Sequence, residues 1–356
     1  MNLCFVLGTR PEIIKLSPLI KLCKKKNIQF NTIHTRQHYD FNMERQFFKE
    51  FKVKPNFFLS INRKNKSNKN FLSKTVIQLT KLYKKLNPDY IISQGDTNTV
   101  LASVLAYNKV KKKIKARMVH VEAGIRSYDN SMPEEYNRIM ADKYSQFLFA
   151  PTAIAKKNII KEKLSNKKIF VVGNTISDTI TQFKTVKAKK KGFFYLTLHR
   201  PETVDNLSRL KTVIQTMINI SKKYDIDIFF PIHPRTKHKV SKLKLKNLKV
   251  LKIIEPCSYK KSLYYQKNSK IVITDSGGLQ EESCILQTPC VTIRNNTERP
   301  ETIKIGSNIL AGYKSNVIEK SINKMLKTKK KWDSPYGKLV SQKILHILKS
   351  NIINEV

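Results

Sequence analysis

Three acidic residues in the first half of the sequence have the type and placement that proton transfer requires. Asp96 and Glu122 come just after short apolar runs, and Glu134 lies in the segment Pro133-Glu134-Glu135-Tyr136-Asn137-Arg138. Carboxyl groups that are held near one another, or partly removed from water, acquire separated pKa values suited to acid–base catalysis. These residues are therefore candidate acid–base groups, although all three would be unremarkable as exposed surface carboxylates.

A cationic turn follows the first apolar run of the chain. Gly8-Thr9-Arg10-Pro11-Glu12 leads into a helical pattern that carries Lys15 one turn later. Cations at a helix start oppose the helix dipole unless an anion lies nearby, so the turn is a candidate anion site. The alternative is a plain strand-to-helix turn with proline at the first helical position. Neither a three-glycine dinucleotide fingerprint nor a Walker A sequence is present, which argues against NAD and ATP.

The second half contains a stronger candidate for a phosphate site. In Asp275-Ser276-Gly277-Gly278, the glycines allow close approach of backbone N–H groups, and a helix start adds further donors. The alternative is a simple helix cap. Arg299 is a candidate partner for the same anion. His199 and His233 also end apolar runs beside arginines, which favours phosphate contacts over metal ligation.

The elements that must position these residues are short β-branched runs alternating with longer amphipathic stretches. This alternation predicts parallel sheets covered by helices, an α/β class, with ligands beyond the carboxyl ends of the strands. The twelve predicted strands span residues 3–7, 30–34, 90–93, 117–121, 147–150, 170–172, 193–198, 226–232, 249–253, 271–274, 290–293 and 308–310. Twelve strands in 356 residues favour two domains, with the second beginning within 173–191. A last helix is predicted over 338–350, and the sequence does not decide on which half it packs.

Composition excludes several classes of protein. Hydrophobic residues make up 40% of the chain, which is enough for buried cores, and no run approaches the roughly 20 apolar residues of a membrane span. The N-terminus lacks the features of a secretory signal. Five scattered cysteines form no CxxC pair, so neither a disulfide framework nor a zinc site is indicated. We therefore expect a cytoplasmic protein without a metal.

The net charge of +43 is extreme. It is typical of nucleic-acid-binding proteins, but lysine runs at predicted helix ends and loops also occur on ordinary lysine-rich surfaces. The absence of aromatic interleaving and of an RNA-binding signature favours the second interpretation, so no specific nucleic-acid partner is expected. An anionic small substrate would still be attracted to the protein.

Taken together, the motifs resemble those of the non-hydrolysing UDP-N-acetylglucosamine 2-epimerases. The resemblance runs in order from about residue 3 to about residue 312, and it is carried by residues 8–12, 95–97, 120–124, 133–138, 274–282 and 297–301. It implies a GT-B-like α/β fold, in which two Rossmann-like, doubly wound parallel-sheet domains face each other across a cleft. Residues 1–172, joined by the C-terminal helix 338–356, would form the sugar side, and residues 173–337 would bind UDP. A homodimer without cofactor or metal is also implied.

The resemblance further implies reversible inversion at C2 of the sugar, which gives UDP-N-acetylmannosamine for surface polysaccharide or glycan synthesis. UDP would leave to give 2-acetamidoglucal and then add back, so the enzyme must stabilise a departing diphosphate and place carboxylates on both sides of the sugar. The implied catalytic residues are Asp96, Glu122, Glu134, His199 and Lys15. The implied substrate-binding residues are Arg10, His233, Ser276, Gly277, Gly278, Glu282 and Arg299.

The sequence departs from the family pattern at two places, and two alternative activities remain open. Ser262 stands where many relatives carry a bulky apolar residue near uracil, and residues 36–40 differ from the bacterial form at their last residues. Some relatives bind a second UDP-N-acetylglucosamine there as an activator. Gln37 is compatible with such a site, whereas Asp40 would repel an anion unless it is paired. A 2-epimerase for a UDP-2,3-diacetamido-2,3-dideoxy uronic acid would share nearly all the motifs. A GT-B glycosyltransferase would need no carboxylate cluster in the first half.

Overall fold

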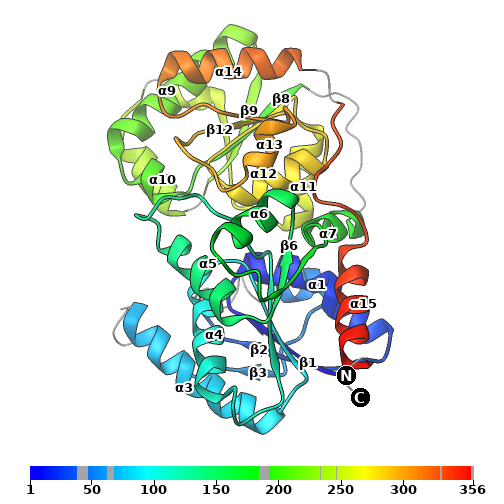
Figure 1. Ribbon diagram of the computed structural model, residues 1–356. Helices are drawn as coiled ribbons and strands as arrows, with labels where there is room; N and C mark the ends of the chain where they lie inside the picture. The colour runs from blue at the N-terminus through cyan, green and yellow to red at the C-terminus, as the bar shows by residue number, and fades with distance from the viewer. Residues whose placement is uncertain are drawn as a thin grey trace. The chain divides into compact units, whose positions relative to one another are not determined.

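The computed structural model describes residues 1–37, 47–61, 68–183, 192–232, 234–245, 247–328 and 331–353. The chain divides into two compact units, each containing one parallel sheet (Figure 1). Unit 1 consists of Met1–Thr181 and Tyr336–Val356, and unit 2 consists of Gln182–Pro335. Two parallel sheets with intervening helices confirm the predicted α/β class.

The sheet of unit 1 has seven strands in the order β3-β2-β1-β4-β5-β6-β7. These strands are β1 (Asn2–Leu7), β2 (Gln29–His34), β3 (Phe57–Phe58), β4 (Tyr90–Gln94), β5 (Arg117–Val121), β6 (Phe147–Ala150) and β7 (Lys168–Val171). The helices are α1 (Arg10–Lys25), α3 (Asn68–Leu86), α4 (Asn98–Val110), α5 (Pro133–Tyr144), α6 (Ala153–Lys161), α7 (Ile176–Gln182) and α15 (Val340–Ile353).

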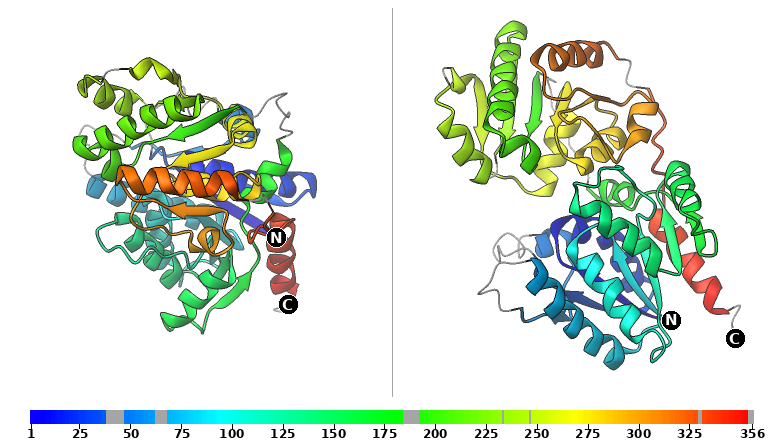
Figure 2. Two further views of the ribbon diagram at one scale, coloured as in Figure 1. Left: turned by 90° about the horizontal axis from the view of Figure 1, so that it is seen from above. Right: turned by 60° about the vertical axis from the view of Figure 1, so that its left-hand side comes forward.

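Helices pack on both faces of this sheet because the chain winds outward from β1 in one direction and from β4 in the other. Helices α3, α4 and α5 lie on one side, and α1 and α15 lie on the other (Figure 1). Figure 2 shows the last helix, α15, beside the strands of unit 1. The hydroxyl of Tyr90 donates to the carbonyl of Leu348 at 3.1 Å, which ties α15 to β4.

The sheet of unit 2 has six strands in the order β10-β9-β8-β11-β12-β13. These strands are β8 (Phe193–Thr197), β9 (Asp227–Pro231), β10 (Leu251–Ile254), β11 (Ile271–Thr274), β12 (Cys290–Thr292) and β13 (Asn308–Leu310). The helices are α8 (Pro201–Val204), α9 (Leu207–Tyr224), α10 (Pro234–Lys242), α11 (Tyr259–Asn268), α12 (Gly277–Ile285), α13 (Pro300–Lys304) and α14 (Ser315–Lys327), and a 3-10 turn spans Leu248–Val250.

Each sheet has one point where the strand order reverses, and Arg10, Asp96, His199 and Ser276 follow the strands that meet there. In unit 1 the reversal lies between β1 and β4, where Phe5 pairs with Ile92. In unit 2 it lies between β8 and β11, where Thr197 pairs with Thr274. Loops that leave neighbouring parallel strands at a reversal point diverge and leave room for a ligand. The fold therefore brings the loops after β1 and β4, and those after β8 and β11, to such positions.

All twelve predicted strands are confirmed, and β3 is an addition. Its two residues, Phe57 and Phe58, pair with Ile33 and His34 at the sheet edge. Two residues are too few to show a strand period in the sequence. Every helix in the described ranges is too short or too polar to cross a lipid bilayer.

Candidate active site

The loop after β1 is organised by Glu12. Its buried carboxylate accepts the backbone N–H groups of Gly8 at 2.6 Å and Thr9 at 2.7 Å, and it also accepts the hydroxyl of Thr97 from the loop after β4. Burial raises the pKa of Glu12 to about 7, although these hydrogen bonds act to lower it. Arg10 begins α1, with its guanidinium 5.5 Å from the ring centre of Phe47.

Gly8 is required where this loop begins. A Cβ there would lie 1.9 Å from Oγ1 of Thr99 and 2.2 Å from Oγ1 of Thr35. These two hydroxyls are hydrogen-bonded to each other at 2.7 Å and occupy the space that a Cβ would need. Glycine therefore allows the first strand to end directly against the start of α4.

Glu122 directly follows β5, and both its side chain and its backbone are held by hydrogen bonds. Its Oε2 accepts hydrogen bonds from Nζ of Lys15 and from Nε2 of Gln94, both at 2.6 Å, and the Lys15–Glu122 ion pair is buried. The backbone φ of Glu122 is +73°, and its N–H and that of Ala123 both donate to the carbonyl of Phe149. A left-handed backbone at a non-glycine residue is strained, and such strain clusters at functional sites.

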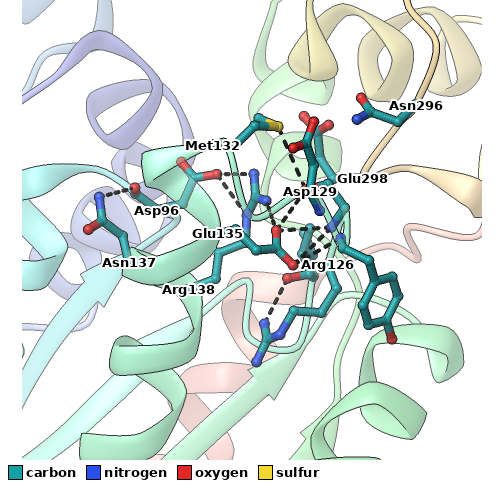
Figure 3. A network of polar contacts seen from close by, with 12 residues as sticks. Asp96, Arg126, Asp129, Met132, Glu135, Asn137, Arg138, Asn296 and Glu298 are labelled. Carbon is teal, nitrogen blue, oxygen red and sulfur yellow. Dashed lines mark hydrogen bonds and ion pairs between the residues drawn. The ribbon is translucent and has the colours of Figure 1, made fainter.

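Asp96 is held by α5. Its Oδ2 accepts Nε of Arg138 at 3.0 Å and Nη2 of the same residue at 2.5 Å, while Nδ2 of Asn137 donates to the backbone carbonyl of Asp96 at 2.9 Å. Figure 3 shows these contacts, together with Glu135 on the other side of the Arg138 guanidinium. Lys15 and Arg138 thus give Glu122 and Asp96 one cation each.

Glu134 was predicted from the sequence as an acid–base residue, but its neighbour Glu135 was not. Glu135 is buried, and it accepts Nη1 of Arg138 at 2.6 Å and the N–H groups of Ser127 and Tyr128. Burial acts to raise the pKa of Glu135, but the bonds from Ser127 and the charge of Arg138 outweigh it and lower that pKa. The i,i+3 spacing of Glu135 and Arg138, which α5 places on one face, was the available signal.

Glu134 differs from the other two predicted carboxylates. It is half-buried in the first turn of α5, and it makes no hydrogen bond or ion pair with any residue that the structure describes. Its carboxyl group is therefore not committed to another side chain in the described part of unit 1.

In unit 2, Asp275 joins the ends of β8 and β11. The buried carboxylate accepts the backbone N–H groups of His199 and Arg200, and its Oδ1 lies 3.2 Å from Nδ1 of His199. Burial acts to raise the pKa of Asp275, but His199 and the backbone bonds outweigh it and lower that pKa. Asp275 orients the His199 ring through Nδ1, and the side chain is 51% exposed, so the rest of the ring is accessible.

The start of α12 lies among charged groups. A Cβ on Gly277 would fall 2.3 Å from Oε1 of Glu298. The Glu298 carboxylate lies 3.3 Å from Nη2 of Arg200 and 2.8 Å from Nη1 of Arg294. A Cβ on Gly278 would meet only Oγ of Ser276, at 3.9 Å. Two guanidinium groups and a helix start with two glycines are features of a phosphate site, although the Glu298 carboxylate already pairs with both guanidinium groups.

Two predicted ligand-binding residues contact other side chains of unit 2. Arg299 donates from Nε to the buried carboxylate of Glu281 on α12. Glu282 accepts Nε2 of Gln266 at 2.6 Å, and Gln266 also donates to Oγ of Ser262 at 3.2 Å. The structure thus brings His199, Ser276 and Gly277 to the ends of β8 and β11, whereas Arg299 and Glu282 are held along α12 and α11.

Three predicted residues remain. His233 and Asp40 lie outside the described residues. Oε1 of Gln37 accepts both the N–H and the hydroxyl of Thr99 at 2.8 Å, which ties the loop after β2 to α4. In the described ranges, no group of three or more His, Cys, Asp or Glu side chains is arranged to hold a metal ion.

Comparison with known proteins gives a consistent result. The family model for UDP-N-acetylglucosamine 2-epimerase matches residues 20–349. A UDP-N-acetylglucosamine 2-epimerase of Methanocaldococcus jannaschii is 45% identical over 98% of this chain and 99% of its own length. A Pseudomonas aeruginosa UDP-2,3-diacetamido-2,3-dideoxy-D-glucuronate 2-epimerase is 33% identical over 90% of this chain and 91% of its own length.

A solved structure is similar over the same extent. The M. jannaschii enzyme in complex with UDP-GlcNAc and UDP has a TM-score of 0.89 and 44% identity, and the match covers 98% of this chain and 100% of that one. The GT-B-like class with two parallel sheets is thereby confirmed.

Proposed function

The chain belongs to the UDP-N-acetylglucosamine 2-epimerase family, and on that premise we propose that it interconverts UDP-N-acetylglucosamine and UDP-N-acetylmannosamine by eliminating UDP and adding it back. Epimerase activity on UDP-N-acetylglucosamine is supported by the family match and by relatives that align end to end. The observation that carries the proposed mechanism is the pair of carboxylates, Glu122 and Asp96, each held just after a strand by a cation. Lys15 pairs with Glu122, and Arg138, which also pairs with Glu135, binds Asp96.

The substrate dictates the order of events. The C2 proton is not next to a carbonyl group, so removing it directly is difficult. If the C1–O bond breaks first and UDP leaves with the bonding electrons, the resulting oxocarbenium ion makes the C2 proton acidic. A carboxylate takes that proton, and a C1–C2 double bond forms to give 2-acetamidoglucal. C2 then receives a proton on the opposite face, and an oxygen of UDP bonds again to C1.

Unit 1 supplies the proton-transfer groups in this proposal. Lys15 and Gln94 both donate to one oxygen of Glu122, and Arg138 donates twice to one oxygen of Asp96, so hydrogen bonds hold both carboxylates in place. Ionised carboxylates can accept a proton. Glu134 has no described partner that would compete with a sugar for its carboxyl group. We therefore assign these three acids to the acid–base set.

Unit 2 supplies the leaving-group site in this proposal. Negative charge grows on the diphosphate as the C1–O bond breaks, so donors aimed at it lower the barrier. The accessible edge of His199, oriented by Asp275, and the first turn of α12 at Ser276 and Gly277 are such donors. The other binding residues in this proposal are Arg10, His233, Gly278, Glu282 and Arg299.

Further roles remain proposals on the same basis. The product would serve polysaccharide or glycan synthesis, and the enzyme would act as a homodimer. Gln37 and Asp40 would belong to a site for activating UDP-N-acetylglucosamine. Residues 1–172 and 338–356 would bind the sugar, and residues 173–337 would bind UDP.

A second substrate has one observation in its favour. The P. aeruginosa relative named for a UDP-2,3-diacetamido uronic acid is 33% identical over 90% of this chain. A carboxylate on the substrate would need a cation that an N-acetylglucosamine does not need. Turnover of the uronic acid without turnover of UDP-N-acetylglucosamine would favour this second activity.

Proton NMR in D2O tests the proposed reaction. Protein incubated with UDP-N-acetylglucosamine should give a second N-acetylhexosamine signal, and deuterium should enter C2 of both sugars. Quenched reactions should contain 2-acetamidoglucal and UDP. Epimerisation without deuterium at C2 would refute proton removal at that carbon. Transfer of the sugar to an added acceptor would instead indicate a glycosyltransferase.

A further inference from the structure

Asp142 is a buried charged residue to which the proposed reaction assigns no role. It lies on α5, and its Oδ1 is 2.6 Å from Nδ1 of His120. Its Oδ2 accepts the N–H of Gly124 at 3.0 Å and Nη2 of Arg126 at 2.7 Å. Burial acts to raise the pKa of Asp142, but His120 and Arg126 outweigh it and lower that pKa. One ionised carboxylate on α5 thus contacts His120 of β5 and two residues, Gly124 and Arg126, of the loop after β5.

His120 extends this contact to the loop that carries Asp96. His120 is a fully buried residue of β5, and its Nε2 lies 2.9 Å from the carbonyl oxygen of Gly95. A carbonyl oxygen can only accept a hydrogen bond, so Nε2 donates here. Gly95 has a φ of +83° and directly precedes Asp96, so the bond fixes the turn from which the Asp96 side chain projects.

The opposite side of Asp142 fixes the loop that follows Glu122. Gly124 has a φ of +79°, and a Cβ there would lie 2.2 Å from the carbonyl oxygen of Ala155, so this loop is tightly packed. Arg126 is held in turn by Glu162 through Nε at 2.6 Å and Nη2 at 2.7 Å. Because Nε and Nη2 both donate to Glu162, the guanidinium is held in the orientation in which Nη2 reaches Asp142.

We propose that Asp142 and His120 are positioning residues for the epimerisation, and that one carboxylate on α5 sets the loops of Asp96 and Glu122 relative to each other. The proposal rests on the acid–base roles proposed above for Asp96 and Glu122. Proton transfer to and from one carbon needs both carboxylates within a fraction of an ångström of their working positions. Neither His120 nor Asp142 needs to touch the substrate for this purpose.

Two substitutions at His120 distinguish the bond to Gly95 from the space that the side chain fills. Glutamine can place an amide nitrogen near the position of Nε2 and keep the bond to Gly95, whereas asparagine is too short to reach it. We expect H120N to lower kcat on the order of 100-fold while the KM for UDP-N-acetylglucosamine changes little, because UDP is bound elsewhere. H120Q should keep most of kcat. D142N should also lower kcat, and H120N/D142N should be no slower than the slower single variant.

The control is A141G on the same helix. Ala141 is buried next to Asp142 but has no part in these bonds, so A141G should lower the melting temperature and leave kcat intact. Deuterium entry at C2 is measured in every sample. No exchange in the parent enzyme would refute the proposed reaction itself. An active parent with equal kcat in H120N, or equal losses in H120N and H120Q, would overturn the positioning role.

Discussion

At the scale of single residues, Glu122 combines two costly features. Its backbone occupies the left-handed region at φ +73°, and its carboxylate is buried beside Lys15. A left-handed non-glycine residue costs roughly 1–2 kcal/mol, and glycine would remove that cost together with the carboxylate. A strained backbone is retained at Glu122 although glycine would relieve it, which fits a need for the carboxylate in the proposed acid–base role.

The buried Lys15–Glu122 pair leads to a stability prediction. K15M should lower the free energy of unfolding by about 3 kcal/mol, because it removes the buried cation that pairs with the Glu122 carboxylate. Adding E122Q should recover part of that loss, because the uncompensated charge is then gone. Urea unfolding of the parent, both single variants and the double variant measures the coupling.

Additivity would contradict this prediction. If the K15M/E122Q double variant loses the sum of the two single losses, the ion pair makes no net contribution to folding. Activity should be low in all three variants whatever the unfolding result, so stability and catalysis are measured separately.

At the scale of elements, Glu12 joins the start of α1 to the loop after β4 and introduces a pH dependence. The pKa of Glu12 is raised to about 7 in the folded chain by burial, against an ordinary value near 4.5. Between these values the folded chain holds a proton that the unfolded chain has lost. Stability must therefore fall as pH rises through this window, by up to about 3 kcal/mol.

Comparison with E12Q isolates this contribution. Glutamine cannot ionise, so between about pH 5 and about pH 8 the parent should lose about 3 kcal/mol more unfolding free energy than E12Q. E255Q, at an exposed carboxylate, is the matched control and should follow the parent. An equal pH response in the parent and E12Q would show that Glu12 does not titrate differently on folding.

Elements were easier to predict from the sequence than the contacts between them. The central strands of both sheets, such as β4 and β11, are short runs of buried residues in which isoleucine and valine predominate, and a sequence pattern reveals such runs. Strand β3 was missed because Phe57 and Phe58 form no pattern by themselves. Asp96 and Glu122 were found because they end strands, and strand ends mark ligand sites in parallel sheets.

The groups that hold those residues were not predictable in the same way. Arg138 lies 42 positions after Asp96, and Asp142 lies 22 positions after His120, so their contacts depend on how α5 packs against β5. Sequence order does not encode that packing. Arg299 was expected to contact an anion, and its bond to Glu281 became visible only with α12 and the loop before α13 in place.

At the scale of the whole molecule, the net charge of +43 is the property that no single site explains. The described ion pairs at the surface, such as Lys237–Glu255 and Lys223–Glu319, are exposed and contribute little to stability. Such a charge does act at a distance, because it raises the local concentration of anions until salt screens it. A nucleotide sugar with a diphosphate group is an anion of this kind.

Salt dependence of the kinetics tests whether this charge serves the substrate. The KM for UDP-N-acetylglucosamine should rise as NaCl goes from about 0.05 M to about 0.5 M, because the screening length falls several-fold, while kcat changes little. Replacing the exposed lysines of α6 and its C-terminal turn, as K156Q/K157Q/K163Q, should make that rise shallower. Duplex DNA and RNA should bind only at the low-salt end, because nonspecific binding depends on counterion release. If RNA stays bound at about 0.5 M NaCl and KM does not respond to salt, the charge serves a nucleic-acid partner instead.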